Sequence, residues 1–237
     1  MAVTITWLGH ATFRVDYDGK VMLIDPWVEG NPVCPTRLKS FDRIDLMLIT
    51  HGHSDHFADA VALAKKHDPL IVCNFEIYQY MAARGLQKFS PMNKGGTVEV
   101  DGLRITMTHA FHSSTITDEK GNVIPAGEPA GFVVRFPDGF TLYDAGDTAV
   151  FGDMRIIGEL YRPSVALLPI GSRFTMDPRE AAYATRLLGV KHVIPMHYGT
   201  FDLLTGTPEQ LRQELHGQEV IVHALKPGDS IESTALR

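Results

Sequence analysis

The sequence of 237 residues is poor in cysteine, which narrows the chemistry open to it. Only Cys34 and Cys73 are present, and they form no CxxC pair. Structural zinc sites and disulfide frameworks both depend on paired cysteines, so neither is expected here. We predict two reduced, structural thiols and no thiol-based catalysis.

Long apolar runs and blocks of positive charge are also missing. No segment approaches the ~20 apolar residues that a membrane helix requires, and no basic region precedes an apolar run at the start. The net charge of −6 and the absence of any Lys/Arg block argue against nucleic acid as a partner. We therefore expect a cytoplasmic protein with a small-molecule substrate and no integral membrane segment, and leave a homo-oligomer open.

Hydrophobic residues make up 44% of the chain, enough for a sizeable core, and no linker or low-complexity segment divides it. Strand hairpins followed by strand–helix alternation occur in one part of the chain and again in the other. This order predicts an α+β fold, a four-layer αββα sandwich of two mixed sheets with helices outside, as a single domain over residues 1–237. The expected strands include 3–8, 12–17, 21–24, 46–50, 70–73, 97–100, 103–108, 131–136, 140–143, 165–170, 192–196 and 220–224, and the expected helices 59–66, 178–188 and one from 207 to near 217.

Four potential metal ligands lie within six residues in His51-Gly52-His53-Ser54-Asp55-His56, directly after the apolar strand pattern at 46–50. In an extended turn His51 and His53 project to the same side, while Asp55 and His56 can turn toward a second ion. A mixed imidazole and carboxylate set is typical of a catalytic transition-metal site. A histidine-rich surface turn is the alternative.

Further ligands are expected where other strand patterns end. His112 follows the strand at 103–108, Asp147 follows the strand at 140–143, and His197 closes the strand at 192–196. The same arrangement, a strand and then a ligand, recurs each time.

These residues in this order resemble the metallo-β-lactamase superfamily, whose pattern is HxHxDH, a lone His, an Asp in a GD turn and a last His. Further segments are similar to the branch of uncharacterised metal-dependent hydrolases related to ascorbate-6-phosphate lactonase and N-acylphosphatidylethanolamine phospholipase D. They are Trp7-Leu8-Gly9-His10, Ile24-Asp25-Pro26, Ala145-Gly146-Asp147-Thr148, Pro169-Ile170-Gly171, Phe174-Thr175-Met176 and His197-Tyr198.

The resemblance implies two divalent ions, zinc first, with manganese, iron or nickel as alternatives. Two dications ~3.5–4 Å apart repel, and a shared anion offsets the repulsion, so Asp147 is implied to bridge them. The implied ligands are His51, His53 and His112 for one ion and Asp55, His56 and His197 for the other.

The function implied is hydrolysis of an ester, lactone, amide or phosphodiester bond by a bridging hydroxide that Asp55 orients. His10 and Tyr198 are further candidate catalytic residues, as groups that support the ligands or orient substrate. A buried, hydrogen-bonded role explains each of them equally well.

Other functions and residues stay open. A di-iron or mono-iron redox enzyme on the same fold is one alternative, and a metal-binding module without turnover is another. Asp25 could support the ligand loop or form a turn, Asp144 is expected as a turn residue and His109 as structural. Arg173 could face an anionic substrate group or be solvated, and residues 115–128 are expected as an exposed loop.

Overall fold

A computed structural model describes residues 2–237 and divides them into two compact units, each built from several stretches of chain. Unit 1 comprises the residues up to Asn93, Ser113–Pro129 and Lys226–Thr234. Unit 2 comprises Lys94–His112, Ala130–Leu225 and Ala235–Arg237. The single domain over residues 1–237 stays a prediction.

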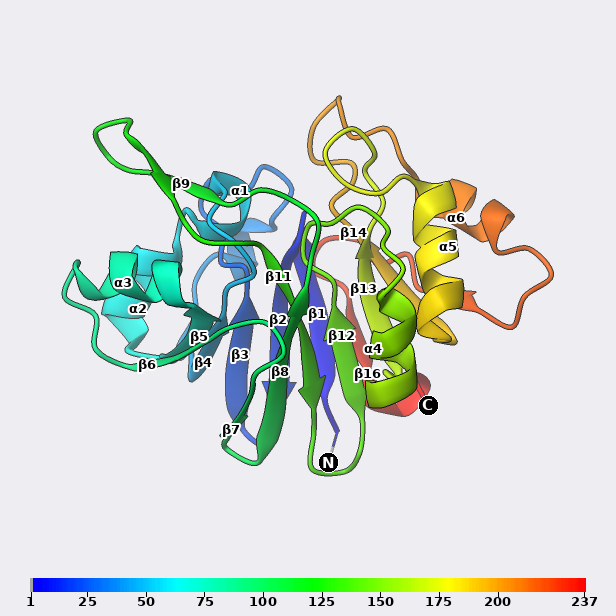
Figure 1. The fold of residues 1–237 in the computed structure, drawn as a ribbon, viewed down its shortest axis with the longest axis horizontal. Coiled ribbons are helices and arrows are strands. Elements are labelled where there is room, and N and C mark those ends of the chain that lie inside the picture. Colours follow the sequence, from blue (N-terminus) through cyan, green and yellow to red (C-terminus); the bar gives the residue numbers. More distant parts are fainter. Residues whose placement is uncertain (1) are drawn as a thin grey trace. The chain divides into compact units, whose positions relative to one another are not determined.

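Unit 1 is built on a seven-stranded mixed sheet (Figure 1). The pairs from β16 to β3 are antiparallel, and those from β3 to β6 are parallel. Consequently β1, β3 and β4 run in the same direction, and their carboxyl ends meet at one edge. The strands in spatial order are β16 (Ser230–Glu232), β1 (Thr4–Gly9), β2 (Thr12–Tyr17), β3 (Lys20–Ile24), β4 (Leu46–Leu48), β5 (Leu70–Asn74) and β6 (Phe89–Met92).

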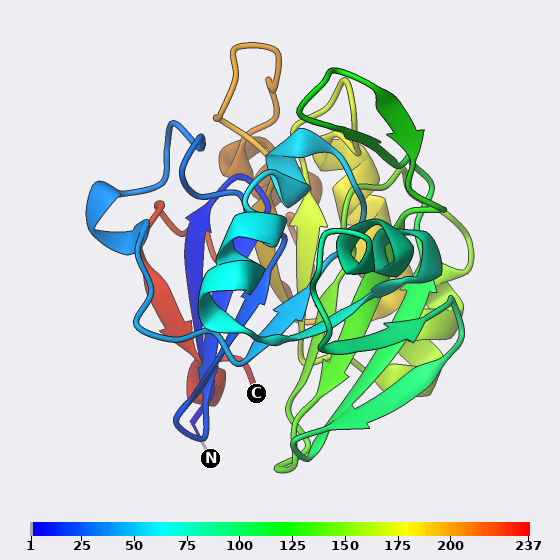
Figure 2. The same cartoon turned by 90° about the vertical axis from the view of Figure 1, so that its left-hand side faces the viewer.

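Helices α2 (Ala60–His67) and α3 (Phe75–Ala82) lie on the side that faces the viewer in Figure 2. Their apolar residues pack with β4 and β5 into a core that includes Ile71 and Ile77. The same unit holds η1 (Thr36–Leu38), α1 (Ser54–Phe57) and a two-stranded sheet of β9 (Thr115–Thr117) and β10 (Val123–Pro125). The polar loop expected at 115–128 thus contains paired strands.

Unit 2 has a second seven-stranded mixed sheet. Its pairs from β7 to β12 are antiparallel and those from β12 to β15 parallel, so β8, β12 and β14 point the same way. The strands in spatial order are β15 (Ile221–Val222), β14 (His192–Met196), β13 (Val165–Pro169), β12 (Thr141–Asp144), β11 (Ala130–Arg135), β8 (Leu103–His109) and β7 (Thr97–Val100).

Three helices pack on this second sheet: α4 (Met154–Tyr161), α5 (Pro178–Leu188) and α6 (Pro208–Glu214). Both α5 and α6 begin with a capping box, at Asp177 and Thr207, as their sequences predict. A 3₁₀ turn, η2 (Ser233–Ala235), lies near the end of the chain. The longest described helix, α5, has 11 residues, and none within residues 2–237 could span a bilayer.

The predicted α+β class with two mixed sheets and helices is confirmed. The Asp18-Gly19 and Asp101-Gly102 turns form hairpins with left-handed backbone at both positions, as two-residue loops require. Asp68 closes α2 in a left-handed conformation just before Pro69. The structure adds elements that were not expected: α1, α3, α4, β6, β9, β10 and β16.

Candidate metal centre

The predicted ligands of unit 1 follow strands that end at one edge of its sheet. His10 comes directly after β1, Asp25 directly after β3, and the segment from His51 to His56, here called the ligand loop, comes shortly after β4. Because these strands are parallel in direction, their carboxyl ends bring the side chains together. His10, Asp25, His51 and His56 are all buried.

Gly52 allows the ligand loop to pack against the β9–β10 segment. A Cβ atom at this position would lie 2.7 Å from Ile116 Cγ1 and 2.8 Å from Ala126 Cβ. The amide N–H of Gly52 also donates to Ser114 Oγ at 3.2 Å. The backbone of the ligand loop is therefore held in place at Gly52 by the β9–β10 segment.

Asp25 organises two of the predicted ligands through a buried network. Its carboxylate accepts hydrogen bonds from the Thr50 amide at 2.8 Å, the Thr50 hydroxyl at 2.6 Å and His56 Nδ1 at 2.7 Å. Since the Thr50 hydroxyl donates its one hydrogen to Asp25, its oxygen accepts from His51 Nδ1, 3.0 Å away. In both His51 and His56 the lone pair is thereby placed on Nε2, ready to bind a cation.

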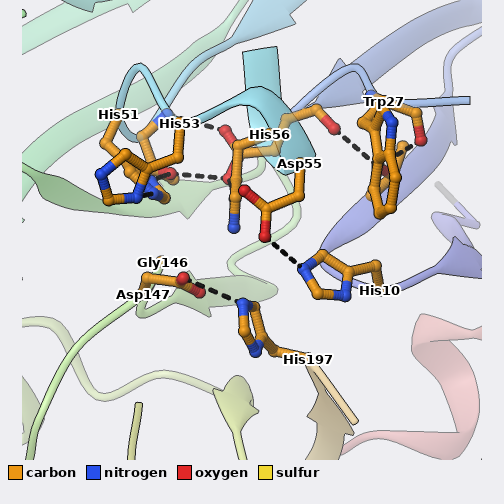
Figure 3. A network of polar contacts seen from close by, with 12 residues as sticks. His10, Trp27, His51, His53, Asp55, His56, Gly146, Asp147 and His197 are labelled. Atoms are coloured by element: carbon orange, nitrogen blue, oxygen red, sulfur yellow. Dashed lines mark hydrogen bonds and ion pairs between the residues drawn. The ribbon is translucent and has the colours of Figure 1, made fainter. Parts of the chain in front are cut away.

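His51 and His53 bring two ring nitrogens close together (Figure 3). His51 Nε2 lies 3.0 Å from His53 Nδ1, with ring centroids 4.6 Å apart. Two nitrogens that bind the same zinc ion, each at ~2.0–2.1 Å, can be separated by this distance. Ser113 Oγ lies 3.3 Å from the other nitrogen of His53, so this ring is also held in place.

Asp55 is the only acid of the ligand loop, and 27% of its side chain is exposed. His10 Nε2 lies 3.0 Å from Asp55 Oδ2 and can donate to it (Figure 3). His10 has a φ of 57°, in the left-handed region, and its backbone carbonyl accepts from Trp7 Nε1 at 2.9 Å. Its ring meets that of Trp27 edge to face. The structure thus places His10 where it orients the Asp55 carboxylate.

Unit 2 brings its three predicted ligands together at the carboxyl ends of β8, β12 and β14. Asp147 Oδ2 lies 3.0 Å from His197 Nε2 and 3.5 Å from His112 Nε2. Asp147 and His197 are buried, and the contact between them offsets part of the cost of removing these polar groups from water. Figure 3 shows the Asp147–His197 contact.

Two tight turns fix these ligands. The Asp144 carboxylate accepts from the Gly146 amide at 2.9 Å, which confirms Asp144 as a turn residue. His197 adopts a left-handed φ of 56°, and its carbonyl oxygen would lie 2.0 Å from a Cβ at residue 171, where the chain has glycine. Left-handed backbone at His10, Asp25 and His197 is costly and persists where the surroundings enforce it, as is typical of functional sites.

The remaining candidates have structural contacts. The Tyr198 hydroxyl donates to the Leu225 carbonyl at 3.4 Å, the ring packs against the core of unit 2, and burial raises its pKa to about 12. This geometry favours a structural role for Tyr198. His109 contacts Lys94 and Phe151, as a structural histidine would. Burial raises the pKa of Cys73 to about 12, consistent with an inert thiol.

Sequence reasoning missed Thr50 and Ser113, which hold His51 and His53. Neither has a signal of its own, because a Thr or Ser beside a histidine is common in any loop. Asp25 carried a weak signal, an Asp-Pro pair directly after a strand. Its hydrogen bonds show that support of the ligand loop, rather than a turn alone, is its role.

The donors in each unit fit a divalent transition metal. They are imidazole nitrogens and carboxylate oxygens, the set preferred by zinc and, with more oxygen, by harder ions. In unit 1, one ligand atom each of Asp25, His51 and His56 lies within 4.8 Å of the others, and Asp25 is already committed to hydrogen bonds. This arrangement favours the two histidines as candidate ligands and Asp25 as the residue that supports them.

Comparison with known proteins agrees with this donor chemistry. The family described as "Beta-lactamase superfamily domain" matches residues 20–198. A UPF0173 metal-dependent hydrolase of Rubrobacter xylanophilus is 53% identical over 97% of this chain and 96% of its own length. The chain belongs to the UPF0173 metal-dependent hydrolases of the metallo-β-lactamase superfamily.

Other UPF0173 hydrolases have a similar sequence identity to this chain. One from Methanopyrus kandleri is 48% identical over 96% of this chain and 99% of its own length. Among solved structures, Igni18, described as a novel metallo hydrolase from Ignicoccus hospitalis, is 37% identical with a TM-score of 0.85 and 98% coverage of both chains. These likenesses show a metallo-β-lactamase fold and a metal-dependent hydrolase.

Proposed function

We propose that this UPF0173 hydrolase binds two divalent ions, zinc in the first place, and cleaves an ester, lactone, amide or phosphodiester bond of a small molecule. The observation that carries the proposal is the Asp25 network, which places the lone pairs of His51 and His56 on the nitrogens that would bind metal. The proposed ligands are His51, His53 and His112 for one ion, Asp55, His56 and His197 for the other, and Asp147 for both.

Two such ions would lower the pKa of a shared water from about 15.7 toward ~7 and polarise the oxygen of the bond to be cleaved. The chain would then position the reactants. Asp55 is within reach of solvent and is held by His10 at 3.0 Å, so its carboxylate can orient the attacking water. Asp147, with an oxygen near two imidazoles, supplies the shared negative charge.

Metal content tests the number of ions. Purified wild-type protein is expected to carry two ions per chain, and Asp147→Ala one or none, because the bridging anion is lost. The control is His216→Ala, which removes an exposed histidine outside the ligand set. Elemental analysis of the three proteins gives the counts. Two ions retained in Asp147→Ala, or one in the wild type, would contradict a shared dinuclear centre.

A pair of variants tests whether ligands from both units serve the same ion. His53→Ala removes a ligand of unit 1 and His112→Ala one of unit 2. We expect each to lose the same ion, with a matching residual metal content and affinity in chelator competition. Loss of different ions in the two variants would contradict the assignment. The same experiment tests residues 1–237 as one functional domain.

A substrate screen tests the activity. Protein loaded separately with zinc, manganese, iron or nickel is assayed on ester, lactone, amide and phosphodiester substrates, alongside Asp55→Ala. We expect turnover with at least one metal and its loss in Asp55→Ala. Turnover of a confirmed substrate that is unchanged in Asp55→Ala would remove Asp55 from its orienting role. The negative net charge favours a small-molecule substrate over nucleic acid.

A further inference from the structure

The loop between β13 and α5, residues 171–176, has an unusual backbone. Ser172 and Arg173 are consecutive non-glycine residues with φ of 66° and 52°. Several other residues with positive φ have an ordinary explanation: Asp18 and Asp101 precede glycine in hairpin turns, and Asp68 closes a helix. Arg173 lies in a tight turn that the Thr175 amide closes on the Ser172 carbonyl at 3.3 Å. Two consecutive left-handed residues that are not glycine are costly, so the surrounding structure must hold this turn in place.

One end of this loop packs on a predicted metal ligand of unit 2, and the other is bonded to the residue that follows a second one. Gly171 packs so closely on the carbonyl of His197 that a Cβ would lie 2.0 Å from it. At the other end, the Met176 amide donates to the carbonyl of Thr148, the residue after Asp147, at 3.1 Å. The Ser172 amide donates a hydrogen bond to the Met176 carbonyl at 3.0 Å, which closes the loop. The tip is therefore fixed relative to two ligands.

This strained tip presents an arginine beside an aromatic ring. Arg173 is exposed, Phe174 is 54% exposed, and the guanidinium carbon lies 5.7 Å from the ring centroid. Within residues 2–237 no carboxylate forms an ion pair with Arg173. A second aromatic, Phe111, is 56% exposed directly before His112, and its amide donates to the Thr148 hydroxyl at 2.9 Å. Thr148 thus holds both segments.

We propose that Arg173 and Phe174 determine specificity by binding an amphiphilic substrate, with a carboxylate or phosphate group on Arg173 and an adjoining apolar group on Phe174. The proposal rests on the hydrolase function above and names the substrate class for it. A guanidinium binds planar or tetrahedral oxyanions with paired hydrogen bonds, and an aromatic face covers apolar surface. Contacts away from the cleaved bond position the substrate for reaction.

Binding of three probes to the metal-replete full chain tests this directly. 4-Phenylbutyrate and 3-phenylpropylphosphonate carry a carboxylate and a phosphonate on the same three-carbon spacer, and 4-phenylbutyramide is their neutral counterpart. We expect the anions to bind the wild type more tightly than the amide, and Arg173→Ala to weaken the preferred anion roughly tenfold or more. Arg173→Lys should recover part of the loss, because charge returns without the paired geometry.

The matched control is Arg179→Ala, which removes an exposed arginine six positions further on, in the first turn of α5. It should leave the affinity for both anions unchanged. Any anion that binds the metal rather than Arg173 would bind equally to wild type and Arg173→Ala. Equal affinity in those two proteins, or no preference of the wild type for anion over amide, would overturn the proposal. The stronger of the two anions identifies the group.

A kinetic arm separates this proposal from the hydrolase function. Matched 4-nitrophenyl esters, one neutral (butyrate) and one with a terminal carboxylate (glutarate), are compared. Arg173→Ala should raise the ratio of KM for the anionic ester to KM for the neutral ester roughly tenfold. An unchanged ratio would count against Arg173. If the wild type cleaves neither ester, ester hydrolysis fails, and the binding experiment still decides the role of Arg173.

Discussion

Asp25 shows how one buried side chain can control several others. Its two oxygens accept three hydrogen bonds from Thr50 and His56, and through the Thr50 hydroxyl it also sets the ring of His51. The acceptor capacity of a carboxylate matches these donors, whereas an amide would face one of them with a donor of its own. Asp25 therefore cannot be replaced by an isosteric amide without cost.

We predict that Asp25→Asn lowers metal affinity by roughly 10–100-fold, the usual loss when a partner behind a metal-binding histidine is removed. Competition against a chelating dye measures the affinity. Asp42→Asn, which alters an exposed acid in the same unit, is the control and should bind metal as the wild type does. Unchanged affinity in Asp25→Asn would show that the network is dispensable.

His192 and His223 form a separate pair in unit 2, with ring nitrogens 3.0 Å apart. Burial lowers the pKa of both. Lys191 adds to the effect on His192, and His192 followed by Arg212 adds to the effect on His223. Because the unfolded chain then binds protons more readily than the folded one, protonation favours unfolding. The neutral pair contributes its full stability above pH about 6.5, the pKa of an unfolded histidine. This stability is lost as the pH falls toward the lower pKa values of the two histidines in the folded protein.

The corresponding prediction is a difference in pH dependence. His223→Gln should lose less unfolding free energy than the wild type between pH 7 and mildly acidic pH. Urea unfolding across this range measures it, and His216→Gln, at an exposed histidine, should follow the wild-type curve. Parallel curves for His223→Gln and wild type would refute the assignment.

At the scale of single elements, the sequence predicted those whose signals are local. Helix α5 matches its predicted bounds because Asp177, Pro178 and Gly189 mark both ends. Strand β16, by contrast, is short and polar and exists only because it pairs with β1, more than 200 residues away. Strand β6 contains Pro91, which argues against a strand in sequence, but it lies at the sheet edge where proline is tolerated.

Two of the missed helices have start signals that are hard to read in sequence. Helix α3 begins at Phe75, and its capping residue Asn74 is also the last residue of β5, so the sequence reads as a continuing strand. Helix α4 has Asp153 at its cap position without a side-chain hydrogen bond. The predicted ligands were accessible from sequence because they follow strands in a recognisable order, whereas Thr50 depends on tertiary contacts with Asp25.

The contrast between the starts of α5 and α4 gives a stability prediction. Asp177 accepts from the Glu180 amide at 2.8 Å, so Asp177→Ala should cost about 1 kcal/mol of unfolding free energy. Asp153→Ala, at the start of α4, removes no such bond and should stay within about 0.5 kcal/mol of the wild type. Urea unfolding of the two variants measures both values. Equal losses would mean that the cap geometry contributes nothing.

At the scale of the whole molecule, metal binding should couple to stability because the proposed ligands come from segments far apart in sequence. At a metal concentration 100 times Kd, one bound ion adds about 2.7 kcal/mol to the free energy of unfolding. We expect chelation to lower the thermal midpoint of the wild type, and less so that of Asp147→Ala. Scanning calorimetry with and without chelator measures the shift, and no effect of chelation would contradict structural coupling.

Pairing of β16 with β1 carries a consequence for synthesis. Ser230–Glu232, which satisfies one edge of β1, is synthesised more than 200 residues after β1 itself. At ~5–20 residues per second, that edge stays open for on the order of ten to forty seconds. A nascent chain that stalls or is truncated before residue 230 would thus display an unpaired apolar strand to chaperones and to other chains.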